Sequence, residues 1–206
     1  MGTAQRRLRE AEERRQAILD AARKVFWTHG FDGATMPQIA GEAELAPGTL
    51  YLYFPSKTAL YVELLFEGYR RFEERLSSVV ASKDRPRDRA EALIDGFFGF
   101  ARENPEYFNI IFFLLQKEGR GGWTARFPAE QVKGLDGRMA ACKAIAARVL
   151  SQVHPGRTPK EIERMVDAVW SMLSGVLFYF KEDSKFRAVA KEAKRLVLEG
   201  LFQGAR

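Results

Sequence analysis

The side chains best suited to chemistry in this 206-residue chain are hydroxyl and amino groups gathered in one short stretch of its first third. Thr49 offers a methyl group that fits thymine and a hydroxyl that can bond a base edge or a phosphate. Tyr51 and Tyr53 offer phenolic hydroxyls to phosphates, and Gly48 permits close approach. Lys57 opposes the dipole at the start of a helix but suits a phosphate held there. These residue types predict a surface that binds duplex DNA.

No group of residues in the sequence is arranged for catalysis. His29 stands beside a helix-ending glycine and His154 lies in a Pro/Gly loop, so neither a metal-ligand spacing nor a catalytic triad is indicated. Residues 119–122 are glycine-rich but lack the preceding strand of a phosphate-binding loop. The lone cysteine, Cys142, lies in an alanine-rich helical stretch and is expected in the core, with a redox-sensing thiol as the alternative. We therefore expect a protein that is not an enzyme and that has no metal site and no cofactor.

Short helices are predicted to position the DNA-binding side chains. An amphipathic pattern over residues 5–28 indicates a first helix, which should end where Gly30 can take the left-handed conformation. Thr35 and Gln38 form a capping box that opens a short second helix. Pro47 is well placed as the first residue of a third. A short helix, a turn and a second short helix, packed on a preceding one, form the geometry that lays a helix in the major groove of DNA.

The third helix should have a core face and an outer face. Leu50 and Phe54 are four residues apart and face inward, while Thr49 and Tyr53 form a second such pair that can face outward. The whole chain carries a net charge of +6, yet residues 1–60 hold eight Lys or Arg against seven Asp or Glu. Specific DNA binding must therefore depend on where the side chains are placed and not on bulk charge.

The rest of the sequence is helical throughout, without a strand signal. The predicted starts and breaks are Ser56 capping a fourth helix, a polar stretch at 82–86, a break at Asn104 and Pro105, a loop at 119–122, a helix from Pro128 to Val153, a capping box at Thr158, and terminal helices over 159–181 and 185–202. The fold class is all-α. We expect an N-terminal three-helix helix-turn-helix DNA-binding domain at residues 1–56 and a C-terminal helical ligand-binding and dimerisation domain at 57–206.

Residues 15–65 resemble the DNA-binding domain of the TetR family of transcriptional regulators. The resemblance is carried by Ala21, Ala22, Phe26, Gly30, Phe31, Thr35, Ile39, Ala40, the run Pro47-Gly48-Thr49-Leu50-Tyr51-Leu52-Tyr53-Phe54 and Lys57. It implies a homodimer that binds palindromic double-stranded operator DNA and is released by a ligand. The residues it implies at the DNA surface are Thr35, Gln38, Pro47, Gly48, Thr49, Tyr51, Tyr53 and Lys57.

The chain departs from the family pattern at two positions of this domain. Glu44 stands in the turn where glycine is usual, and a residue with a side chain at positive φ costs about 1 kcal/mol. Ala46 stands where serine usually caps the recognition helix, and its missing hydroxyl costs about as much again. The recognition helix is therefore expected to be less rigid before it binds DNA.

The C-terminal domain is dense in aromatic residues, which suit an apolar ligand pocket between helices. The candidate lining residues are Phe97, Phe100, Tyr107, Phe108, Ile111, Phe112, Trp123, Phe127, Trp170 and Phe178. Ordinary core packing is the alternative for each of them, and the family resemblance is what favours a pocket. A long-chain acyl-CoA or a fatty acid is the first candidate effector. A planar drug-like or aromatic compound, sensed by a repressor of an efflux or degradation operon, is the alternative.

The last two helices resemble the pair with which family members dimerise. Trp170, Ser174, Gly175 and Phe178 fall near one stripe of the first of them, where small residues allow close approach across a two-fold axis. The alternative is that this stripe faces its own core. No apolar run reaches the length of a membrane span, no secretion signal is recognisable and the single cysteine suits a reducing compartment, so we expect a cytoplasmic protein with no membrane contact.

Overall fold

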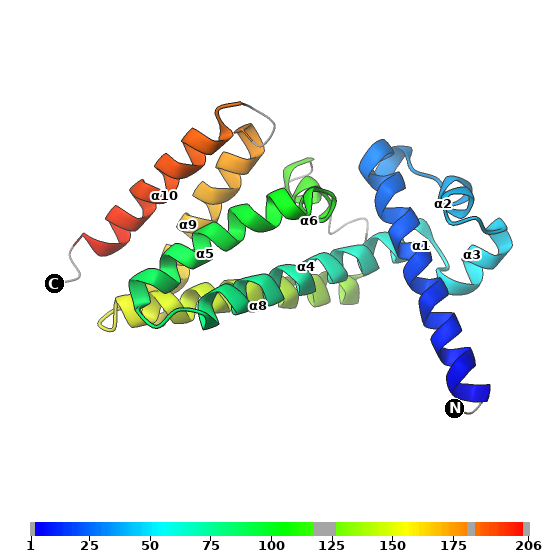
Figure 1. The fold of residues 1–206 in the computed structure, drawn as a ribbon, viewed down its shortest axis with the longest axis horizontal. Helices are drawn as coiled ribbons and strands as arrows, with labels where there is room; N and C mark the ends of the chain where they lie inside the picture. Colours follow the sequence, from blue (N-terminus) through cyan, green and yellow to red (C-terminus); the bar gives the residue numbers. More distant parts are fainter. Residues whose placement is uncertain (1–2, 118–126, 181–183, 204–206) are drawn as a thin grey trace. The chain divides into compact units, whose positions relative to one another are not determined.

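The computed structural model describes residues 3–117, 127–180 and 184–203 of the chain. Every regular element within these residues is an α-helix, which confirms the predicted fold class (Figure 1). The helices are α1 (Thr3–Gly33), α2 (Met36–Glu42), α3 (Pro47–Tyr53), α4 (Lys57–Ala81), α5 (Pro86–Glu103), α6 (Pro105–Lys117), α8 (Ala129–Val153), α9 (Pro159–Phe180) and α10 (Phe186–Phe202).

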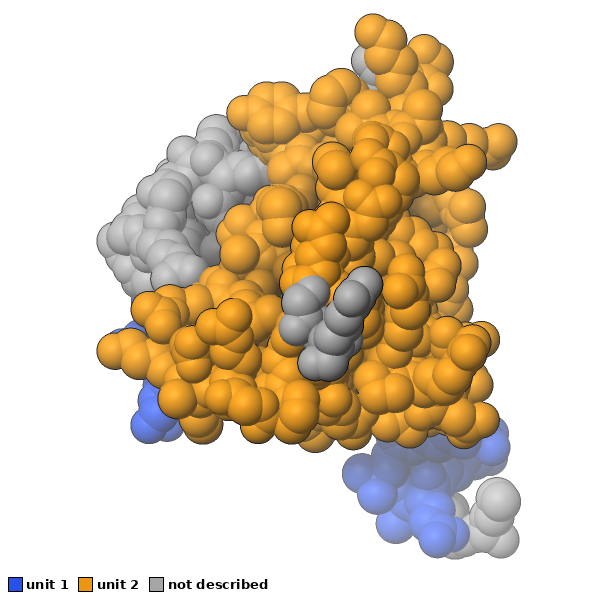
Figure 2. All heavy atoms as spheres, turned by 90° about the vertical axis from the view of Figure 1, so that its left-hand side faces the viewer, with its two compact units in different colours: residues 1–68, 106–135 blue, residues 69–105, 136–206 orange. Residues whose placement is uncertain are grey.

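The chain forms two compact units, which are coloured separately in Figure 2. Unit 1 comprises residues 1–68 and 106–135, and unit 2 comprises residues 69–105 and 136–206. Both α4 and α8 contribute residues to each unit. The boundary expected after residue 56, where the DNA-binding part would end, falls just before α4 and stays a prediction.

Local signals set the helix ends of unit 1. Gly30 has φ +67°, so the regular part of α1 ends there as predicted. The capping box of Thr35 and Gln38 is present at the start of α2. Glu44 has φ +55° in the turn before α3, and Ala46 caps α3 without a side-chain hydrogen bond. Both predicted departures are therefore real features of the turn that holds α3.

The core of unit 1 joins α1 to the helix-turn-helix through aliphatic and aromatic side chains. Ile18 and Leu50 are fully buried, and Phe54 is nearly so. An aromatic cluster gathers at the end of α1, where the Phe26 and Phe31 rings each have their centroids 4.9 Å from that of Tyr61 in α4. This packing fixes the direction of α3 relative to α1 and the start of α4.

The core of unit 2 is built around a second aromatic cluster. Phe72 of α4 meets Phe100 of α5 at a centroid distance of 4.8 Å and Trp170 of α9 at 5.6 Å. Phe97 meets the same tryptophan edge to face at 5.2 Å. Cys142 is fully buried in α8, as expected for a core cysteine. Among the described residues, no helix combines the length and the apolar character needed to cross a membrane.

Candidate DNA interface and effector pocket

The recognition helix α3 exposes one complete face to solvent. Leu50 and Phe54 are buried, at 0% and 3% exposure, which confirms the predicted core face. Pro47 and Gly48 are exposed, and Tyr51 is half exposed. A helix turns by about 100° per residue, so the outward direction is the one opposite the two buried side chains. The outer face of α3 is therefore free to enter a groove of DNA.

Leu52 lies at the centre of this outer face, and the sequence analysis did not single it out. It is two residues from both buried side chains, about 200° away around the helix axis, and its side chain is 85% exposed. Thr49 and Tyr53, which were predicted to face outward, are half-buried at the flanks. Its position opposite both core residues could have indicated that Leu52 is exposed, but an apolar side chain gives no hint of a role at a surface. An exposed apolar group here suits the thymine methyl group in the major groove.

Thr35 and Gln38 are exposed at the start of α2, and their polar atoms hold the helix cap. The Gln38 side-chain oxygen accepts from the Thr35 backbone N–H at 2.8 Å, and the Thr35 hydroxyl oxygen accepts from the Gln38 N–H at 3.3 Å. These bonds satisfy donors that the first turn of a helix leaves open. The positions are available to DNA, and their role as phosphate contacts stays a prediction.

Lys57, predicted to contact a phosphate, has other partners inside unit 1. Its ammonium donates to the carbonyl oxygens of Phe31 at 2.7 Å and Ala34 at 2.9 Å, with the Asp32 oxygen at 3.4 Å. It also lies 4.7 Å from the centroid of the Phe31 ring. The first residue of α4 thus ties down the chain between α1 and α2. A cation at these carbonyls stabilises the segment that leads into the helix-turn-helix.

A buried polar chain links three helices of unit 1. Arg23 of α1 donates to the Tyr107 hydroxyl of α6 at 3.0 Å. Tyr107 in turn bonds the carboxylate of Glu67 in α4, a residue only 9% exposed. Burial, followed by this bond to the carboxylate, raises the pKa of Tyr107 to about 12. Glu67 was missed from the sequence because an acid among apolar residues can as easily lie on a solvated face.

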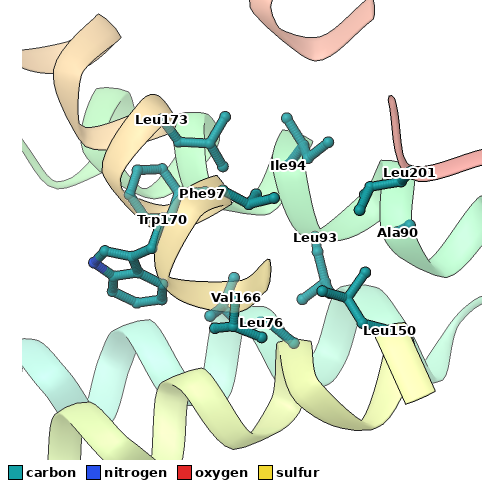
Figure 3. A pocket seen from close by; sticks show the side chains of 12 residues that line it. Leu76, Ala90, Leu93, Ile94, Phe97, Leu150, Val166, Trp170, Leu173 and Leu201 are labelled. Atoms are coloured by element: carbon teal, nitrogen blue, oxygen red, sulfur yellow. The ribbon is translucent and has the colours of Figure 1, made fainter. Parts of the chain in front are cut away.

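An apolar pocket lies within unit 2, where side chains of α4, α5, α8, α9 and α10 converge (Figure 3). Its lining is entirely apolar and comprises Leu76, Ala90, Leu93, Ile94, Phe97, Ala146, Leu150, Val166, Val169, Trp170, Leu173 and Leu201. The space inside for water-sized molecules is about 50 Å³. A lining without charged side chains or accessible polar surface cannot satisfy a charge, so the part of any ligand that enters must be a hydrocarbon.

Two of the predicted ligand-binding residues, Phe97 and Trp170, line this pocket. Phe100 is buried beside Phe72 in the core of unit 2, and Phe178 is 52% exposed. The residues predicted from α6 and from the segment just before α8 pack inside unit 1, and these are Tyr107, Phe108, Ile111 and Phe127. Trp123 and the side chain of Phe112 lie outside the described residues. The ligand-binding role of these residues outside the pocket stays a prediction.

The stripe predicted to dimerise is divided between the inside and the surface of unit 2. Trp170 points inward, onto Phe72 and Phe97. Gly175 has open space where a side chain would stand, and Phe178 is half exposed. Further large apolar side chains are exposed nearby on the same helix and on α10, namely Met172, Tyr179 and Leu196. Within the described part of unit 2, the outward part of the stripe is thus an exposed apolar surface.

Comparisons with known proteins agree with this geometry. Residues 18–64, which span the helix-turn-helix, match the model of the bacterial regulatory proteins of the tetR family. The transcriptional repressor KstR of Mycolicibacterium smegmatis is 26% identical over 179 residues, which cover 87% of this chain and 82% of KstR.

Two solved structures share the fold at low sequence identity. The regulator FadR from Bacillus subtilis, solved with stearoyl-CoA, superposes with a TM-score of 0.71 at 18% identity, covering 90% of this chain and 98% of FadR. AibR, solved with isovaleryl coenzyme A and operator DNA, has a TM-score of 0.71 at 20% identity and covers 92% and 98% of the two chains. The helix-turn-helix of this chain, with its exposed recognition helix, belongs to the tetR family of bacterial regulatory proteins, and the chain is a DNA-binding transcriptional regulator and not an enzyme.

Proposed function

We propose that this regulator is a repressor that binds a palindromic operator as a homodimer and is released by a hydrophobic effector, a long-chain acyl-CoA or a fatty acid. The observation that carries the effector class is the apolar pocket of unit 2, whose accessible lining is apolar and includes no charged side chain. A charged head group has no partner there, whereas a hydrocarbon chain gains from burial at roughly 25 cal/mol per Å² of apolar surface.

The residue types that line the pocket favour a hydrocarbon chain over a planar compound. Two aromatic residues, Phe97 and Trp170, stand among twelve lining residues, and the others are aliphatic. The free space of about 50 Å³ is small, since an engineered apolar cavity of about 150 Å³ holds a single benzene. An effector must therefore push the helices apart as it enters. A ligand that prefers the widened state shifts the protein toward it, which is what an inducer has to do.

Helix α4 offers a continuous route for this effect along the chain. Leu76, in its second half, lines the pocket of unit 2, while Lys57, at its first residue, holds the segment before α2 in unit 1. Displacement of α4 by a ligand would alter the spacing of two recognition helices, which must match one turn of DNA, about 34–36 Å, or a multiple of it. The neighbours solved with acyl-CoA ligands, FadR and AibR, support this effector class.

The test is a fluorescence anisotropy titration of the protein on an operator duplex obtained by selection from random DNA. Palmitoyl-CoA should release the duplex, and coenzyme A without the acyl chain should not. Ala146→Phe fills the pocket with a ring and should keep operator binding while losing the response to palmitoyl-CoA. The control Ala140→Phe adds the same ring at an exposed site of the same helix, α8, and should respond normally. An operator complex indifferent to palmitoyl-CoA in the wild type would discard the effector class.

The proposed dimer is supported by the exposed apolar side chains of α9 and α10. Met172 is 50% exposed, Phe178 52%, Tyr179 74% and Leu196 56%, and several large apolar side chains exposed on a pair of helices favour an interface there. Analytical ultracentrifugation should give twice the chain mass of 23.4 kDa. Phe178→Glu should yield a monomer, whereas the control Leu8→Glu, at another exposed apolar position, should stay dimeric. A wild-type monomer at micromolar concentration would contradict the dimer.

A further inference from the structure

The first turns of α1 form a helical arm whose side chains are exposed among the described residues of unit 1. Every residue from 4 to 14 is exposed, including the apolar Leu8 at 71%. In Figure 1 this dark blue segment extends past α3 with no other helix of unit 1 beside it. Buried residues of α1 begin only at Ile18. We call residues 4–14 the N-terminal arm.

One face of the N-terminal arm continues the face by which α1 packs on the helix-turn-helix. Arg7 and Arg14 stand fourteen and seven residues before the buried Ala21. Ala4 and Ala11 likewise stand fourteen and seven residues before the buried Ile18. Seven residues are nearly two helical turns, so this stripe looks toward the side on which α3 lies.

The arm leaves the domain at the carboxyl end of the recognition helix. Arg15, at the root of the arm, has its guanidinium 5.2 Å from the centroid of Phe54, the residue that ends α3. The same guanidinium pairs with Glu63 of α4 at 3.0 Å. A DNA duplex held by the outer face of α3 would therefore continue alongside the arm.

The charges of the arm suit a phosphate backbone on this stripe. Arg6 pairs with Glu10 at 3.0 Å and Arg9 with Glu13 at 3.3 Å, away from the stripe. Arg7 and Arg14 have no ion-pair partner among the described residues, so their charges are available. They are about 10 Å apart along the helix axis, which is roughly three base-pair steps of B-DNA. The two alanines of the stripe leave room for a duplex to approach closely.

We propose that the N-terminal arm is a second DNA contact, in which Arg7 and Arg14 bind phosphates of the duplex that flanks each operator half-site. The proposal rests on the proposed binding of an operator by α3. It explains how a domain with almost no net charge over residues 1–60 gains affinity for DNA. The contact is to backbone phosphates, so it adds affinity and salt dependence without adding sequence preference.

The test measures the salt dependence of binding to two duplexes, both selected for tight binding by the wild type. One ends at the outer edges of the half-sites, and the other continues for about ten base pairs on each side. Each lost phosphate contact lowers the slope of log K against log salt by about 0.9. Arg7→Gln with Arg14→Gln should lower the slope on the long duplex by about 1.8 per protomer. Between 50 and 200 mM salt the wild type should then lose about twelve-fold more affinity per protomer than the double variant.

On the short duplex the double variant and the wild type should have equal slopes. The control Lys160→Gln with Lys191→Gln removes two exposed charges from unit 2 and should match the wild type on both duplexes. Glutamine is a good helix former, so circular dichroism should show unchanged helix content in both variants. The proposal would be overturned if wild type and arm variant had equal slopes on the long duplex. It would also be overturned if the control variant lowered that slope as much as the arm variant does. Either result would leave operator binding by α3 intact.

Discussion

Replacing Lys57 by methionine distinguishes its two possible roles, a phosphate contact and an internal clamp. Methionine keeps the apolar stem beside the Phe31 ring but removes the ammonium that donates to the carbonyls of Phe31, Asp32 and Ala34. A phosphate contact would matter only in the complex with DNA. A clamp would matter in the free protein as well, because it holds the segment between α1 and α2.

The structure sets the size of the effect. Two of the three bonds, at 2.7 and 2.9 Å, have good geometry, and Lys57 is half-buried. A hydrogen bond from a charged donor contributes about 1.5–3 kcal/mol when buried, and partial exposure lowers this to about 1 kcal/mol for each good bond. We expect Lys57→Met to lower the free energy of unfolding by about 2 kcal/mol. For a chain of this length that corresponds to a melting temperature roughly 4–8 °C lower.

Thermal unfolding of the free protein and the salt dependence of operator binding are the two readouts. A clamp predicts the lower melting temperature, with a salt slope that changes by much less than the roughly 0.9 of one phosphate contact. The matched control is Lys24→Met, which removes the same charge from the same unit but breaks only an exposed pair with Glu42, 3.0 Å apart and worth about 0–1 kcal/mol. An unchanged melting temperature together with a slope lower by about 0.9 would refute the clamp and restore the phosphate contact.

Three further outcomes are expected. Leu52→Ala should leave the melting temperature unchanged, since the side chain is 85% exposed. It should weaken operator binding by about 1 kcal/mol only where a thymine methyl is present. An equal loss of affinity on an operator that carries deoxyuridine in place of thymidine would contradict this contact. Tyr107→Phe should destabilise the protein to urea by about 1–3 kcal/mol, because Arg23 and Glu67 lose a buried partner, and an effect below about 0.5 kcal/mol would argue against the polar chain. Burial raises the pKa of Cys142 to about 12, so the thiol stays protonated at pH 8. It should resist alkylation by iodoacetamide until urea unfolds the protein. Rapid labelling of the folded protein would revive the redox hypothesis.

Helix ends were predictable because short-range chemistry determines them. Glycine takes positive φ without strain, so Gly30 marks the end of the regular part of α1. The pairs Thr35–Gln38 and Thr158–Glu161 each close a capping box within four residues of chain. The starts of α5, α6 and α9 at prolines follow from the same local logic. The all-α class and the helix-turn-helix required nothing beyond these signals and the family resemblance.

The facing of individual side chains was less predictable, because it depends on contacts far apart in sequence. Tyr107 is aromatic and was expected in a ligand pocket, yet a partner 84 residues earlier, Arg23, bonds it inside unit 1. Trp170 was predicted both at the dimer surface and on the pocket; its ring packs on Phe72 and Phe97 inside unit 2, and both roles stay predictions. Leu52 was given no role, because its apolar side chain offers no polar contact to DNA. Periodicity gives the angle between residues of one helix but not the direction of the core.

The most direct test of the central claim is a selection of duplexes from random DNA with the purified protein, followed by sequencing. We expect enrichment of a palindrome whose half-site centres are about 34–36 Å apart, or a multiple of that distance, as two copies of α3 related by a two-fold axis require. Enrichment should disappear with Leu52→Lys combined with Tyr51→Ala, which alter only exposed side chains of α3. Failure of the wild type to enrich any sequence over random DNA would contradict the assignment of α3 as a recognition helix.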